Sequence, residues 1–137
     1  MTAQRTDTII INGDEHVMYS LPLELYWEKN NNRPSLISFN TGLNRGYYAK
    51  WLIEKNKLYL IDFYGENGFP LIKEYSLPDL FPLAKDKIFA DWFSGDIRIP
   101  MGKQVHYSHS AWGSEYELTT TLLFQNGVIV DSGSFVI

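Results

Sequence analysis

The sequence predicts a mainly β fold, either a single-domain antiparallel β-sandwich or a partly closed barrel of roughly nine strands. Alternating apolar and polar segments, separated by Gly, Pro and Asn turns, fill the C-terminal third of the chain. Asn126-Gly127 is the strongest of these turn signals. Some segments, such as 58–61, are apolar on both sides, as expected for strands covered on both faces. With 137 residues and 45% hydrophobic content, one domain can bury its own core.

The N-terminal part predicts a leader and a first hairpin. We expect residues 1–6 to form a flexible leader and residues 7–137 to form the single β domain. Two apolar segments, 7–12 and 16–20, are separated by a turn near Asn12-Gly13, which is typical of a tight hairpin.

The next segments predict one ambiguous element and a second hairpin. Residues 23–29 fit a short helix, because Pro22 suits a first helical turn, or a strand, because the apolar residues alternate. Residues 47–54 and 57–63 then form a hairpin that turns around Lys55-Asn56.

A clear helical signal follows near residues 77–82. Ser76 and Asp79 have the spacing of a capping box, in which each residue satisfies a backbone donor at the start of a helix. Pro82 ends this helix after about one turn. We therefore expect one short helix here.

A third hairpin is predicted from residues 93–99 and 103–109, with 100–102 (Pro-Met-Gly) as a three-residue loop. This register places Asp96 directly opposite His106 on a polar face. The pair either sets the register as an exposed contact or belongs to a patch that binds an anionic group. The candidate residues of this patch are Asp96, Arg98 and His106.

Three ionisable residues fall on faces that we expect to be core. His109 shares a side with the apolar residues of its strand, and Asp62 follows the parity of the core residues in its hairpin. A two-residue turn at Asn126-Gly127 pairs Asp131 with Leu122, so Asp131 also points inward. Either these side chains escape to solvent at a bulge or a strand end, or they line a wet interior pocket.

Composition and charge narrow the classes of function. The chain has no cysteine and only three histidines, so we expect no metal site and no cofactor. The net charge is −4, and residues 104–137 contain no Lys or Arg, which argues against a nucleic-acid face. No apolar stretch approaches the length of a membrane span, so we expect no membrane contact and a cytoplasmic location. The general character is that of a small bacterial domain, and no family motif can be quoted.

The leading hypothesis is a non-enzymatic binding protein that recognises another protein. The acidic balance suits a basic partner, and an immunity or antidote protein is one form of this hypothesis. Its predicted contact surface is aromatic and acidic. The candidate binding residues are Tyr107, His109, Trp112, Glu115 and Glu117. One alternative is a β-barrel that binds a small ligand in its interior. A further alternative is a hydrolase-like enzyme that uses His109 with Asp62 or Asp131 as acid and base.

Overall fold

The computed structural model describes residues 5–38, 42–68, 73–84, 86–106 and 115–132, with the backbone alone for strand residues 101–106 and 115–119. Within these ranges the chain forms nine strands and two short helices. In chain order they are β1 (Asp7–Ile11), β2 (Asp14–Met18), α1 (Pro22–Asn30), β3 (Tyr47–Glu54), β4 (Lys57–Asn67), β5 (Lys73–Ser76), α2 (Leu77–Leu80), β6 (Ile88–Phe89), β7 (Gly95–His106), β8 (Glu115–Gln125) and β9 (Val128–Asp131).

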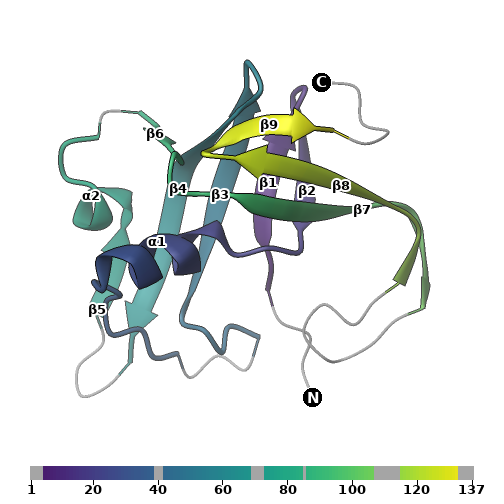
Figure 1. Cartoon of the computed structure of the whole chain (residues 1–137). Helices are drawn as coiled ribbons and strands as arrows, with labels where there is room; N and C mark the ends of the chain where they lie inside the picture. The colour runs from purple at the N-terminus through teal and green to yellow at the C-terminus, as the bar shows by residue number, and fades with distance from the viewer. Residues whose placement is uncertain (1–4, 39–41, 69–72, 85, 107–114, 133–137) are drawn as a thin grey trace.

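All nine strands belong to one sheet that is nearly closed into a barrel. The order is β2-β1-β3-β4-β9-β8-β7, and β5 and β6 each pair with β4. Figure 1 shows β7, β8 and β9 crossing in front of β1 to β4, so the sheet curls over its own inner face. At the seam between the two end strands, the amide of Tyr19 donates to the carbonyl of Arg98 at 2.8 Å. The mainly β prediction is therefore confirmed, in its barrel form.

Three predicted hairpins form around two-residue turns. In each turn both central residues have positive φ, which is the type I′ geometry that matches the twist of the flanking strands. The turn residues are Asn12-Gly13, Lys55-Asn56 and Asn126-Gly127. Most strand pairs are antiparallel, and β1 with β3 is a parallel pair.

The ambiguous segment after Pro22 is a helix. Pro22 stands in its first turn, and Asn31, with φ of 50°, ends it in the left-handed conformation. Leu23 and Trp27 are four residues apart on one side of α1, and both are buried. The ring of Trp27 lies 5.1 Å from that of Tyr47 in β3, so α1 packs against the barrel. This packing decides between the two predicted conformations.

The short helix α2 begins as the sequence predicts. The amide of Ser76 donates to the carboxylate of Asp79 at 2.7 Å, and both halves of the capping box are present. The helix ends at Leu80, one turn after it begins.

Apolar side chains from both halves of the sheet fill the interior. Fully buried apolar residues come from β1, β2, α1, β3, β4, β7 and β8, and they include Ile9, Trp51, Leu60, Ile97 and Leu122. Within the described part of the chain, no helix is long and apolar enough to cross a membrane.

The predicted hairpin around residues 100–102 is wrong. β7 continues through Pro100 as one strand and pairs with β8, so Asp96 lies opposite Leu123 and not opposite His106. β8 has eleven residues, and a partner of similar length satisfies more of its backbone than a short hairpin strand would. Pro100 is tolerated because β7 is an end strand, and the register shift between Met101 and Gln104 leaves Gly102 and Lys103 as the irregular part of the strand.

Of the two alternatives for Asp62 and Asp131, the structure agrees with exposure to solvent at a bulge, and the inward orientation is wrong, because both side chains are exposed. In β4 the register passes from Leu60 directly to Asp62, so Ile61 is an extra residue that reverses the parity. A register shift between β8 and β9 likewise places Asp131 opposite Leu123, which is 44% exposed. The interior pocket predicted from these two residues is therefore not formed by them.

Candidate functional site

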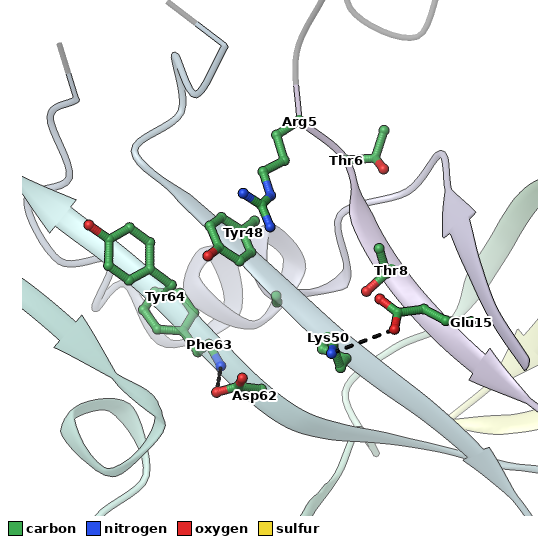
Figure 2. Close-up of a pocket in the computed structure, with 10 residues that line it drawn as sticks. Arg5, Thr6, Thr8, Glu15, Tyr48, Lys50, Asp62, Phe63 and Tyr64 are labelled. Atoms are coloured by element: carbon green, nitrogen blue, oxygen red, sulfur yellow. Dashed lines mark hydrogen bonds and ion pairs between the residues drawn. The ribbon is translucent and has the colours of Figure 1, made fainter. Parts of the chain in front are cut away.

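A polar hollow of about 210 Å³ lies on the outer face of β1 and β3 and the adjoining part of β4. Strand alternation produces it. In β3, Tyr47, Ala49 and Trp51 are buried in the barrel, whereas Tyr48 and Lys50 point outward. Figure 2 shows the side chains that line the hollow, which are Arg5, Thr6, Thr8, Glu15, Tyr48, Ala49, Lys50, Asp62, Phe63 and Tyr64.

Three side chains that pack against one another, Arg5 over the Tyr48 ring and Tyr48 against Tyr64, form one wall of the hollow. The guanidinium carbon of Arg5 lies 3.7 Å from the centre of the Tyr48 ring, and the Tyr48 and Tyr64 rings are 5.4 Å apart (Figure 2). An arginine stacked on a ring keeps its in-plane N–H groups free for a ligand. This wall therefore offers both an aromatic surface and a row of charged donors.

Hydrogen bonds fix the Tyr64 ring. Its hydroxyl donates to Oε2 of Glu66 at 2.7 Å, and the Ser38 hydroxyl donates to the other oxygen of the same carboxylate. The carboxylate raises the pKa of Tyr64 to about 12, and the two hydroxyl donors lower the pKa of Glu66. Tyr64 therefore stays neutral, and Glu66 stays ionised, at neutral pH.

Two cations and two anions line the hollow. Lys50 Nζ lies 3.6 Å from Glu15 Oε1, in a pair that is about half exposed. Oδ1 of Asp62 accepts a hydrogen bond from the amide of Phe63 at 2.9 Å. With Lys50 and Glu15 paired to each other, Arg5 and Asp62 are the charges that a ligand would meet.

A buried carboxylate lies behind this wall. Asp7 has no exposed surface, and it accepts hydrogen bonds from Arg45 Nη2 at 2.6 Å, from the Ala49 amide at 3.0 Å and from Trp51 Nε1 at 3.0 Å. Burial raises the pKa of Asp7, while these three donors stabilise the ionised form and act in the opposite direction. All three contacts are donors to the carboxyl group, which suits an ionised carboxylate.

The same arginine fixes Arg5 at the rim of the hollow. Arg45 Nη1 donates to the carbonyl of Arg5, and the amide of Arg5 donates to the carbonyl of Gly42 at 2.7 Å. Residues 1–4 of the expected leader lie outside the described residues, but the backbone of Arg5 is held on both sides. A residue that we expected in a flexible leader thus forms part of the candidate site.

The residues predicted from the sequence are spread over several places. Asp62 lines the hollow. Asp96 and Arg98 are exposed on β7, where their carbonyls accept hydrogen bonds from Ser20 and Tyr19 across the seam of the barrel. Asp131 is exposed at the end of β9. The backbone alone is described for His106, Glu115 and Glu117. Three further predicted residues lie outside the described residues, and they are Tyr107, His109 and Trp112.

Of the residues that line the hollow, Asp62 alone was among the predicted site residues, so sequence reasoning missed Arg5, Tyr48 and Tyr64. The outward parity of Tyr48 and Lys50 could have been read from the alternation in residues 47–54. Arg5 has no such local signal, because its backbone partners are about 40 positions away in the chain.

The described residues contain no group of three or more His, Asp or Glu side chains close enough together to hold a metal ion. Comparisons of the chain with protein-family models, with curated proteins and with solved structures found no match.

Proposed function

We propose that this protein is a non-enzymatic binding protein that recognises another protein, and that the polar hollow is part of its contact surface. The observation that carries the proposal is the stack of Arg5, Tyr48 and Tyr64 beside the hollow. Tyrosine and arginine are enriched among the residues that contribute most to protein interfaces, because they combine large contact areas with directed hydrogen bonds. Here the two tyrosines lie on β3 and β4, and the backbone of Arg5 is hydrogen-bonded to Gly42 and Arg45, which lowers the entropy lost on binding.

The net charge of the chain supports a protein partner with a basic surface. A charge of −4 attracts such a partner over long distances and repels the phosphate backbone of nucleic acids. An antidote that neutralises a basic toxin in the cytoplasm is one concrete form of this proposal. The aromatic and acidic surface predicted around Trp112 and Glu115 remains a second predicted part of the contact.

A pull-down with the full chain tests the proposal. Tagged wild-type protein is incubated with host lysate, washed at low and then high salt, and the bound proteins are identified by mass spectrometry. The Tyr48→Ala variant is run in parallel, because it removes the centre of the stack. Tyr59→Ala is its matched control, since Tyr59 is a half-buried tyrosine of β4 whose ring centre lies 5.8 Å from that of Phe89 and which does not line the hollow.

The two variants separate the possible outcomes. A stoichiometric partner that is retained by Tyr59→Ala and lost by Tyr48→Ala supports binding through the hollow. A partner retained by both variants places the contact elsewhere and overturns the role of the hollow. If the wild-type protein captures no partner in stoichiometric amount, the proposal of a protein-binding function fails. Far-UV circular dichroism and a thermal melt confirm that each variant is folded.

A further inference from the structure

We infer that the Arg5 end of the hollow binds a carboxylate, which the partner presents as an acidic side chain or as its chain terminus. This inference rests on the proposed function and specifies the chemistry of one contact within it. The guanidinium carbon of Arg5 lies 3.7 Å from the centre of the Tyr48 ring, and no carboxylate with a described side chain lies within ion-pair distance of Arg5.

A guanidinium in this position is suited to a planar oxyanion. Its five N–H groups lie in one plane and match the two oxygens of a carboxylate, so stacking on Tyr48 leaves that edge available. Thr6 and Thr8 line the same hollow, and their hydroxyls can both donate and accept hydrogen bonds. Arg5 is therefore the charged donor at this end of the hollow.

The position of Arg5 is set before any ligand arrives. Its amide is bound to Gly42 and its carbonyl to Arg45, which is in turn held by the buried carboxylate of Asp7. A side chain anchored at its backbone and stacked on a ring loses less entropy on binding than a free surface arginine. Such preorganisation distinguishes Arg5 from an ordinary surface charge.

The other charges in the hollow limit how strongly it can hold an anion. Asp62 lines the same hollow and repels any anion there, whereas Arg5 attracts it, and both effects grow with the charge of the anion. Glu15 contributes less to the repulsion, because Lys50 lies 3.6 Å from it. The choice of a carboxylate therefore rests on its planar pair of oxygens, which matches the planar guanidinium of Arg5.

The inference is compatible with a partner that is basic overall. Net charge acts over many ångströms and speeds the encounter, whereas a charged hydrogen bond acts only at contact. A segment that carries a carboxylate beside a basic group would satisfy Arg5 and Asp62 together.

An NMR titration of the full ¹⁵N-labelled chain tests the inference with defined probes. N-acetyl-glutamate α-amide represents an acidic side chain, and N-acetyl-glycine represents a chain terminus. Their neutral amides, N-acetyl-glutamine α-amide and N-acetyl-glycinamide, have nearly the same shape without the charge, and inorganic phosphate is a fifth probe. The Nε–Hε signal of Arg5 and the amide signals of Thr6 and Tyr48 report binding at the site.

Arg5→Gln removes the charge from the proposed site, and Lys73→Gln is the matched control. Lys73 is an exposed cation that lies 5.0 Å from the ring of Tyr75 on β5 and does not line the hollow. We expect saturable binding of at least one carboxylate probe, none of the neutral amides, and a roughly tenfold weaker affinity in Arg5→Gln, the loss typical of a charged hydrogen bond. Lys73→Gln should retain the wild-type affinity.

Each result decides the question. The carboxylate probe that binds more tightly identifies the source as a side chain or a terminus. Phosphate that binds more tightly than both carboxylates at the same signals overturns the carboxylate assignment, as does a titration that does not saturate or that is unchanged in Arg5→Gln. If the pull-down partner is kept while the probes fail, the protein-binding proposal stands and the carboxylate inference alone is lost.

Discussion

The buried carboxylate of Asp7 offers the sharpest test of how this fold is held together. The substitution Asp7→Asn keeps the size of the side chain but replaces one oxygen by an NH₂ group. All three neighbours of this group, Arg45, Trp51 and the Ala49 amide, are hydrogen-bond donors. The new NH₂ group therefore faces a donor, and Arg45 loses its counter-charge.

The expected cost follows from these contacts. Removing one partner of a buried ion pair destabilises a protein by about 3–5 kcal/mol, and leaving a buried donor unsatisfied costs roughly 1–3 kcal/mol. Burial already penalises the ionised carboxylate, as the raised pKa of Asp7 indicates, and this offsets part of the loss. We therefore expect Asp7→Asn to lower the free energy of unfolding by about 3 kcal/mol, which would lower Tm by roughly 10 °C.

Urea denaturation followed by tryptophan fluorescence and circular dichroism measures this cost. Asp14→Asn is the control, because Asp14 is exposed at the start of β2 and should change the stability by less than about 0.5 kcal/mol. In a double-mutant cycle with Arg45→Met, the double variant should be less destabilised than the sum of the single variants by at least about 1 kcal/mol. A cost below about 1 kcal/mol for Asp7→Asn would refute the reasoning, since a neutral isostere would then replace the carboxylate adequately.

Two further predictions concern a turn and a titration. Gly127→Ala should destabilise the protein by roughly 2–4 kcal/mol in urea denaturation, because φ is +81° and the new Cβ would lie 2.5 Å from the carbonyl oxygen of Ala90. Gly13→Ala, at φ of +85° with open space around it, should cost only about 1 kcal/mol, and equal losses would exclude the steric argument. Tyr64→Phe removes one donor to Glu66, so the lowered pKa of that carboxyl should rise toward its ordinary value in a ¹³C NMR titration. The pKa of Glu66 is lower in the folded protein than in the unfolded chain, so the ionised carboxyl stabilises the fold at pH values above the unfolded pKa. This stabilisation is lost as the pH falls through the native pKa. Tyr64→Phe makes the stabilisation smaller, so the variant should lose less stability on acidification. An unchanged pKa of Glu66 would contradict this assignment.

Several elements could be predicted because their signals are local. The Asn-Gly turns require residues that tolerate positive φ, and the capping box of α2 needs two side chains three positions apart. Alternation in residues 47–54 predicts which side chains face the core of the barrel. In each case the residues that determine the structure are neighbours in the chain.

The sequence by itself thus determined the class of fold, the three two-residue turns and the start of α2. The tertiary structure alone decided that residues 100–102 continue a strand, since this depends on a partner strand about 20 residues away. It also decided that Asp62 faces the hollow, because one extra residue in β4 reverses the parity of the strand. Arg5 joins the site through contacts with Gly42 and Arg45, which become its neighbours only when the chain folds. Local conformational preferences depend on residues that are close together in the chain. Strand register and contacts between distant segments depend instead on which backbone groups pair with one another in the whole fold.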